Sequence, residues 1–171
     1  MRILRRIAFT IIGIFVVLQF IRPGRNTMDT PSPHDINTRF AVPPEIQTVL
    51  RSSCYDCHSN NTRYPWYAEV QPVGWFLSDD IQNGKKHLNF SEFGRYTVRQ
   101  QFIRLSDIIE QIDEEKMPLP AYLMIHTDAR LSSAQKDLVI AWVRSAEDSI
   151  RAWYPPDSLA GPRRASRENR K

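Results

Sequence analysis

Two cysteines and a histidine stand close together in the segment Cys54-Tyr55-Asp56-Cys57-His58. This Cys-x-x-Cys-His spacing is the attachment signature of a c-type haem. Two thiols on one turn of chain can each form a thioether with a vinyl group of the porphyrin. The histidine that follows then lies under the ring with its imidazole aimed at the iron. The sequence therefore predicts one covalent haem c, held by Cys54 and Cys57, with His58 as an iron ligand.

Other chemistry for these cysteines has less support. A structural zinc site needs four ligands, but the chain has no further cysteine, and His87 and His126 stand alone. A thioredoxin-like pair is expected beside a βαβ pattern, and no convincing strand pattern lies nearby. A Cys54–Cys57 disulfide stays open as an alternative for a protein outside the cytoplasm.

A single haem leaves the second axial position of the iron to another side chain. The candidates are Met117, Met124, His126 and His87. Met117 directly follows a strongly predicted helix, and Pro118 favours an extended conformation for it, while Pro120 stiffens the following segment. Because a thioether on such a loop is oriented in advance, we expect Met117 to be the ligand, with His126 as the alternative.

The N-terminus has the pattern of a membrane-targeting segment. Arginines precede the apolar run Ile7–Ile21. A helix of that run would be about 23 Å long, short of the roughly 30 Å hydrocarbon core. Apolar residues at positions 3 and 4, with Arg5 and Arg6 snorkelling to the headgroups, make a span feasible. No small-residue cleavage site follows, so we expect residues 1–22 to be an uncleaved signal anchor, and a cleaved signal peptide is the alternative.

Composition predicts how the rest of the 171 residues is organised. Residues 23–40 are rich in Pro, Asn, Asp and Thr and are predicted to be a linker. Residues 41–154 have room for one haem-binding domain, and residues 155–171 are expected to form a basic, flexible tail that includes Arg163 to Lys171. The net charge of +4 is concentrated at the two ends, which is not the pattern of a nucleic-acid-binding face.

Apolar periodicity predicts four helices in an all-α domain. The first is opened by Pro43-Pro44 and leads into Cys54, with Ile46, Val49 and Leu50 on one face. The second covers Val73 to about Asn83, with Gly84 as its C-terminal stop. The third runs from about Thr97 to Glu115. The fourth begins at Ser132, where Gln135 completes a capping box, and continues to Pro155. Its predicted buried stripe comprises Leu138, Val139, Trp142, Ala146, Ile150 and Trp153.

The chain resembles the bacterial haem-binding domain proteins, which are small, cytochrome-c-like proteins common in Bacteroidota. The resemblance covers roughly residues 40 to 150. It rests on Cys54 to Asn60, Tyr64-Pro65-Trp66-Tyr67, Leu88 to Ser91, Met117-Pro118-Leu119, Tyr122, His126 and Ala129-Arg130-Leu131. It implies a periplasmic, mostly helical haem domain with His58 and Met117 on the iron. That family commonly has a histidine where this chain has Asp80, so the role of that histidine is not carried over.

Further residues are candidates for contact with the haem. Trp66 or Tyr67 would donate a hydrogen bond to a propionate from the wall of the pocket, or the aromatic run would be plain core. Arg63 would pair with a propionate carboxylate, or would lie solvated on the surface.

These observations predict a carrier of single electrons and not an enzyme. His/Met ligation fills both axial positions of a haem iron and raises its reduction potential. We expect an inner-membrane protein whose haem domain faces the periplasm, because bacteria attach haem to this motif outside the cytoplasmic membrane. Its expected partners are periplasmic or inner-membrane redox proteins. The alternatives are a small-ligand sensor, a peroxidase-like enzyme, or a fixed haem subunit of a respiratory complex.

Overall fold

The computed structural model describes residues 1–159, and within them every regular element is a helix. The all-α prediction is therefore confirmed for this part of the chain, while the predicted basic tail from Arg163 onward lies outside it. The helices are α1 Arg2–Leu18, α2 Pro44–Ser53, α3 Tyr55–His58, α4 Val73–His87, α5 Val98–Asp113, α6 Pro120–Leu123 and α7 Ser133–Trp153. Short 3₁₀ helices are η1 Ile36–Thr38, η2 Trp66–Glu69, η3 Phe90–Arg95, η4 Thr127–Ala129 and η5 Pro156–Ser158.

The chain divides into two compact units. Unit 1 consists of Met1–Pro31 and Cys54–Ser91, and it contains the Cys-x-x-Cys-His segment, η2 and α4. Unit 2 consists of Ser32–Ser53 and the chain from Glu92 onward, and it contains α2, α5, α6 and α7.

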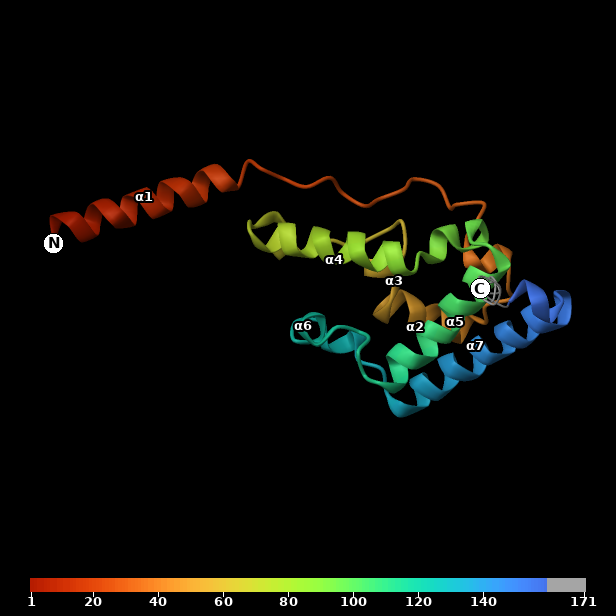
Figure 1. Ribbon diagram of the computed structural model, residues 1–171. Helices are drawn as coiled ribbons and strands as arrows, with labels where there is room; N and C mark the ends of the chain where they lie inside the picture. The colour runs from red at the N-terminus through yellow and green to blue at the C-terminus, as the bar shows by residue number, and fades with distance from the viewer. Residues whose placement is uncertain (160–171) are drawn as a thin grey trace, which may run out of the picture. The chain divides into compact units, whose positions relative to one another are not determined.

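The core of unit 2 is built by α5 and α7, which lie side by side and run in opposite directions (Figure 1). α2 packs on α7 through Ile46, Val49 and Leu50, which are buried as predicted. The buried side chains of α5 are Gln101, Leu105, Ile108 and Ile112, and those of α7 are Val139, Trp142, Val143, Ala146, Glu147 and Ile150. The α7 stripe is narrower than predicted, because Leu138 and Trp153 at its edges are exposed.

Side-chain caps define where the two long helices of unit 2 begin. Thr97 accepts a hydrogen bond from the Gln100 main-chain N–H, and the Gln100 side chain accepts from Thr97 in return. Ser132 and Gln135 form the same reciprocal pair at the start of α7. The capping box predicted there is confirmed. Each cap contributes about 1 kcal/mol to helix stability.

The predicted end of the second helix at Gly84 is wrong, since α4 continues to His87. Gly84 is a packing residue and not a helix stop. A Cβ atom at this position would lie 2.8 Å from the main-chain oxygen of Cys57 and 3.3 Å from its carbonyl carbon. The absence of a side chain allows α4 to approach α3 closely, which explains why a glycine occupies a helix interior.

The end of the predicted anchor and the beginning of the predicted linker make many contacts within unit 1. We call residues 19–28 the strap. The Gln19 side chain exchanges two hydrogen bonds with the main chain of Gln71, and the Trp75 indole N–H donates to the Ile21 carbonyl at 2.7 Å. Later in the same predicted linker, Ile36 and Phe40 are buried in unit 2.

Asn26 is the main attachment point of the strap. Its side-chain amide N–H donates to the Ser59 carbonyl at 2.8 Å and to the Thr62 hydroxyl at 2.9 Å. Its main-chain N–H donates to the Tyr64 hydroxyl, and its carbonyl accepts from the Thr62 N–H. Lys85 of α4 donates to its side-chain oxygen. The strap is thereby joined to the loop that follows His58.

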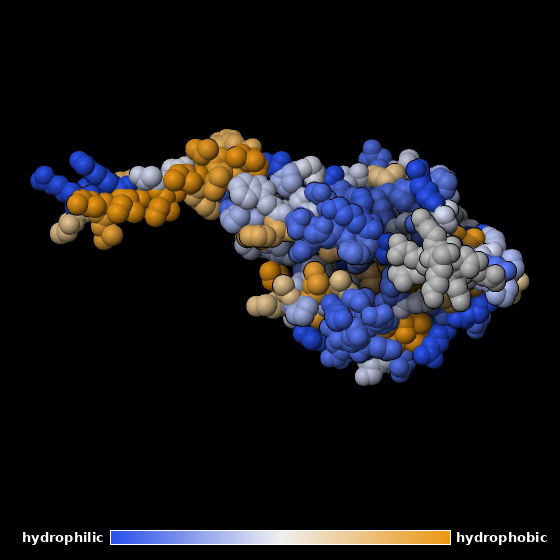
Figure 2. Space-filling view, viewed as in Figure 1, coloured by the Kyte–Doolittle hydropathy of each residue, from blue (hydrophilic) through white to orange (hydrophobic). Residues whose placement is uncertain are grey.

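α1 has 17 residues, and none of them is buried. Its apolar side chains are exposed along the helix, with the arginines near its N-terminal end (Figure 2). Among the helices of residues 1–159, none has the combined length and apolar content that crossing a membrane requires.

Candidate functional site

The Cys-x-x-Cys-His segment forms the single turn α3. Cys54 is the N-cap residue, and its carbonyl accepts hydrogen bonds from the N–H groups of Cys57 at 3.2 Å and His58 at 2.9 Å. This turn places both thiols and the imidazole on one short stretch of chain. Both cysteines are free thiols in the structure, so the Cys54–Cys57 disulfide considered above is not formed.

Both thiols lie in surroundings that oppose ionisation. Burial, followed by the neighbouring Cys57, raises the pKa of Cys54 to about 12. Burial, followed by the carboxylates of Asp80 and Asp56, raises the pKa of Cys57 to about 11. A redox-active or metal-binding cysteine pair needs accessible thiolate at neutral pH. These thiols stay protonated, which argues against a thioredoxin-like function.

The His58 ring has a defined orientation and a defined tautomer. Its Nδ1 lies 2.9 Å from the Leu88 carbonyl oxygen, and because a carbonyl can only accept, Nδ1 carries the proton. The unprotonated Nε2 then has its lone pair available for a metal. Burial lowers the pKa of His58, which favours the neutral ring, although the hydrogen bond to Leu88 opposes this shift. Phe90, almost fully buried, meets the ring edge-on with centroids 6.5 Å apart.

A closed ring of buried side chains holds the Leu88 segment against the loop after His58. The Asn89 amide donates to the Asn60 side-chain oxygen at 2.9 Å. The Asn60 main-chain N–H donates to the Ser91 hydroxyl at 3.1 Å, and the Ser91 N–H donates to the Asn89 side-chain oxygen at 3.1 Å. All three residues are buried. Because Leu88 directly precedes Asn89, this ring also fixes the carbonyl that orients His58.

Arg63 pairs with a carboxylate of the attachment segment itself. Its main-chain N–H, Nε and Nη2 donate to the buried Asp56 at 3.0, 3.3 and 3.2 Å. The guanidinium is largely exposed at its outer side. Arg63 thus links the turn that carries the cysteines to the loop beyond it. Its predicted contact with a propionate stays a prediction.

The two aromatic candidates differ in their surroundings. The core interpretation is wrong for Trp66, which is 80% exposed at the start of η2. Tyr67 is half-buried and meets the Trp66 ring edge-on. Burial, followed by the negative charges of Asp56 and Cys57, raises the pKa of Tyr67. Its hydroxyl therefore stays protonated at neutral pH and can donate a hydrogen bond.

Asp80 lies on α4 near the attachment turn, since its charge raises the pKa of Cys57. Burial, followed by repulsion from Asp79, raises the pKa of Asp80 itself. A carboxylate at this position gives the surroundings of Cys57 a negative charge.

The expected iron ligand Met117 follows a well-formed helix terminus in unit 2. Glu115 has φ of 55°, and the N–H of Glu115 and of Lys116 donate to the carbonyls of Ile112 and Gln111. This is a Schellman motif. The Met117 N–H also donates to Gln111, at 3.1 Å, so the backbone of the methionine is fixed to the helix end.

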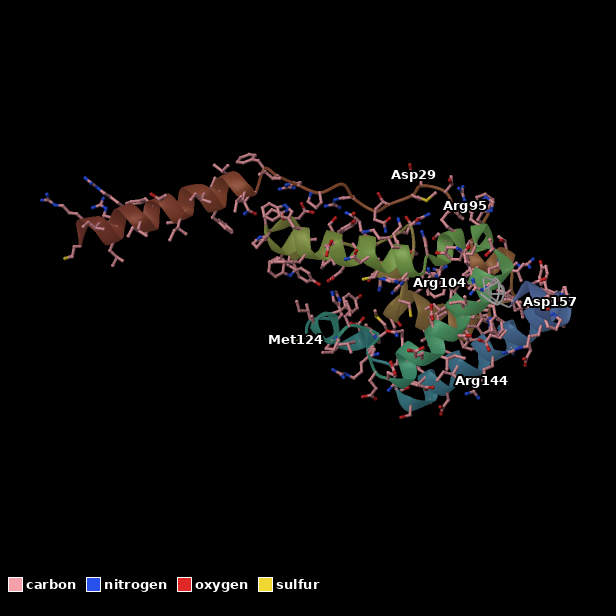
Figure 3. All side chains as sticks on the ribbon, viewed as in Figure 1. Asp29, Arg95, Arg104, Met124, Arg144 and Asp157 are labelled. Carbon is pink, nitrogen blue, oxygen red and sulfur yellow. The ribbon has the colours of Figure 1, made fainter. Side chains whose placement is uncertain are left out.

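The alternative ligands of unit 2 lie farther along the chain. His126 stacks on Tyr122, with ring centroids 4.3 Å apart and planes 18° apart. Met124 is 82% exposed, and its side chain extends outward from the segment after α6 (Figure 3). The His126 main chain is also fixed, since its N–H donates to the Tyr122 carbonyl at 2.9 Å. The assignment of Met117 to the iron stays a prediction.

The donor set fits a covalent c-type haem better than a metal ion. Within residues 1–159, no group of three or more His, Cys, Asp and Glu side chains could hold a metal ion. A haem requires two thiols one turn apart and a neutral imidazole whose distal nitrogen is free, and α3 supplies these three groups. Cys54, Cys57 and His58 are the residues that would hold it.

Several residues of the site were not predicted from the sequence. Leu88 to Ser91 and Asn60 were named only as part of the family resemblance. The hydrogen bond from His58 to the Leu88 carbonyl, the contact with Phe90 and the pairing of Asn60 with Asn89 were not predicted. The available signal was the occurrence of polar, short side chains on both sides of apolar Leu88 and Phe90, which is unusual for a simple surface turn.

Comparison with known proteins gives one match. The model of a family described as "Haem-binding domain" matches residues 13–145, which is most of the chain. No curated protein and no solved structure gives a significant match.

Proposed function

Because the chain belongs to the haem-binding domain family, we propose that it is a membrane-anchored, monohaem c-type cytochrome that transfers single electrons between redox partners. The observation that carries the proposal is the hydrogen bond from His58 Nδ1 to the Leu88 carbonyl in a Cys-x-x-Cys-His turn. It leaves Nε2 free, which is the nitrogen that an axial ligand needs. His58 also directly follows Cys57, whose thiol could form a covalent thioether.

When bound, haem supplies a one-electron couple at its iron. The residues of this chain determine how the group is held. Cys54 and Cys57 would anchor it covalently, and His58 would ligate the iron from a ring that the Leu88 carbonyl has already oriented. Tyr67, whose pKa is raised by burial, would donate a hydrogen bond to a propionate. A covalently anchored group is retained even where its edge is open to solvent, which suits exchange with protein partners.

We assign the second axial position to Met117. Its main chain is fixed by Gln111 on one side and by Pro118 on the other, so its thioether enters the site with little conformational freedom to lose. A His/Met pair raises the reduction potential and leaves no open position on the iron. The absence of an open position favours electron transfer over binding of oxygen or peroxide.

We further propose that α1 is a signal anchor in the inner membrane, with the haem domain on the periplasmic side. Large exposed apolar surfaces mark sites that contact a membrane or another protein. A 17-residue helix is about 25 Å long, so the bilayer must thin locally, or the flanking arginines must snorkel. The strap then keeps unit 1 close to the anchor, which raises the effective concentration of membrane partners.

The proposal is tested by carbon monoxide binding to the reduced, haem-loaded protein, with electron exchange with small redox mediators measured in parallel. Electron carriage predicts slow or no carbon monoxide binding near neutral pH together with fast mediator exchange. Met117→Ala is expected to bind carbon monoxide rapidly, and Met124→Ala is the matched control that should behave as wild type. Rapid, stoichiometric binding by the wild type would contradict electron carriage and favour a sensor or peroxidase-like function.

A further inference from the structure

Unit 1 contains a cavity that shares Asn89 with the hydrogen-bonded ring near His58 but includes none of the proposed haem-binding residues. Its volume is about 540 Å³, within the range of small-molecule sites. It is formed between the strap, which contributes Gly24, Arg25 and Asn26, and the face of α4 that carries Gln82, Lys85 and Lys86. None of the lining residues is Cys54, Cys57 or His58.

The lining of the cavity is cationic. Arg25, Lys85 and Lys86 are its charged residues, and no Asp or Glu side chain lines it. Arg25 and Arg22 both bind the single carboxylate of Glu69, so these three side chains together keep one positive charge. Lys86 donates to the neutral Asn83 amide oxygen at 3.2 Å. Three cationic side chains thus lie around one cavity.

The remaining lining residues supply neutral hydrogen-bonding groups and an apolar surface. The hydroxyls of Tyr64 and Ser78 and the amide of Gln82 line the cavity, and the almost fully buried Ile81 contributes an apolar surface. Arg25 lies over the Tyr64 ring, 5.1 Å from its centroid, which holds the guanidinium in place. The strap is fixed to α4 through the hydrogen bond from Lys85 to Asn26, so the two walls are formed in the folded protein.

We propose that this cavity binds a phosphate-bearing anion. Ammonium and guanidinium groups flanked by hydroxyls and amides are the donors that phosphate oxygens require, and charge-assisted hydrogen bonds are the strongest available to such a ligand. The same chemistry fits two sources: a soluble phosphate compound, or the headgroup of an anionic phospholipid. The second source rests on the proposed anchoring of α1, whereas the first does not.

The experiment uses the full-length, haem-loaded protein in two preparations. In detergent, binding of inorganic phosphate is measured by isothermal titration calorimetry. In nanodiscs of phosphatidylcholine with or without phosphatidylglycerol, native mass spectrometry counts the phosphatidylglycerol retained on the protein. One-to-one phosphate binding in detergent identifies a soluble anion. Retention of one phosphatidylglycerol without phosphate binding identifies a headgroup. If neither probe binds with defined stoichiometry, the proposal is overturned.

Variants separate this site from general surface charge. Lys85→Gln with Lys86→Gln should weaken binding by about tenfold or more, as expected for the loss of charge-assisted hydrogen bonds. Arg99→Gln with Arg144→Gln removes the same charge from exposed positions on α5 and α7 and should leave binding unchanged. Arg144 is labelled in Figure 3. Equal weakening by both pairs would show non-specific attraction and refute the site.

Substitutions of Gln82 leave the hydrogen bond between Lys85 and the strap intact. Gln82 is exposed at the cavity and bonds only to Ser78 among the contacts described for its side chain within residues 1–159. Gln82→Lys should tighten binding and Gln82→Glu should weaken it, with the haem absorption spectrum unchanged in both. Affinities that do not move in these opposite directions would contradict an anion site at this place.

Discussion

His58 donates a hydrogen bond from Nδ1 to the main-chain carbonyl of Leu88 at 2.9 Å, joining two residues thirty positions apart in the sequence. The bond fixes both the tautomer and the rotation of the imidazole. The carbonyl is itself held at the end of α4, because the Leu88 N–H donates to the Gly84 carbonyl at 2.9 Å. Changes that move the end of α4 should therefore alter the orientation of His58, the proposed iron ligand, without touching it.

Gly84→Ala should destabilise the protein and reduce haem attachment. The added Cβ would lie 2.8 Å from a main-chain oxygen of the attachment turn, and backbone cannot move aside as a flexible side chain can. Overpacking of this kind costs about 1–3 kcal/mol, more than the roughly 0.5–1 kcal/mol that alanine gains over glycine in a helix. Urea denaturation and the ratio of haem absorbance to protein measure the two effects.

Gly24→Ala is the control for that substitution, since nothing lies within 4 Å of a Cβ atom placed there. It should leave both the stability and the haem content unchanged. Equal stability of Gly84→Ala and the wild type would show that α4 and α3 do not pack as closely as described.

Asn89→Ala should lower the free energy of unfolding by about 1–3 kcal/mol, because it removes buried hydrogen bonds whose partners stay buried. The Asn60 side-chain oxygen and the Ser91 N–H both lose the group that they contact. The matched control is Asn83→Ala, which removes the same side chain from an exposed position of α4. The midpoint of urea denaturation should fall for Asn89→Ala alone. Similar midpoints for the two variants would show that the hydrogen bonds of Asn89 do not stabilise the protein.

The parts of the fold that follow from local chemistry could be predicted from the sequence. The capping box of Ser132 and Gln135 and the apolar face of Ile46, Val49 and Leu50 are local patterns, and both were predicted correctly. Haem attachment at Cys54, Cys57 and His58 was predicted from residue types and spacing alone, and it stays a prediction. Such features need no knowledge of which segments meet in space.

The parts that depend on tertiary contacts could not be predicted in this way. Gly84 has the pattern of a helix stop, and only the approach of the Cys57 backbone explains why the helix continues through it. The strap has linker composition, yet Asn26 bonds to residues more than thirty positions away. The partner of His58 is a main-chain carbonyl, which leaves no signature in the type of side chain at Leu88.

Asp80→Asn should stabilise the protein at neutral pH. Burial and Asp79 raise the pKa of Asp80 in the folded state above its ordinary value of 3.8, so the unfolded chain releases this proton more readily. The resulting destabilisation develops as the pH rises from 3.8 through the folded-state pKa and persists above it. Below that window both states are protonated and the penalty vanishes.

Thermal unfolding from pH 3 to pH 8 measures this effect. The gain of Asp80→Asn over wild type should be present near neutral pH and absent at the acid end. Asp29→Asn, at an exposed position just after the strap (Figure 3), makes the same chemical change and should show no such pH-dependent gain. A gain of equal size at every pH would mean that ionisation of Asp80 is not its cause.

Met117→Ala should remove the near-infrared sulfur-to-iron absorption band of the oxidised protein and lower its reduction potential, because a thioether ligand raises that potential. His126→Ala should retain the band, since its ring stacks on Tyr122 and is not needed for thioether ligation. Absence of the band from the wild type, or its survival in Met117→Ala, would transfer the ligand assignment to another residue.

Covalent attachment of one haem through Cys54 and Cys57 is the central claim, and the intact mass of the denatured protein tests it most directly. Protein matured in cells competent for cytochrome c assembly should retain the mass of one haem after denaturation. The pyridine haemochrome spectrum should indicate two thioether bonds. Cys54→Ala with Cys57→Ala should lose the added mass. A wild-type mass equal to that of the bare polypeptide would contradict the account.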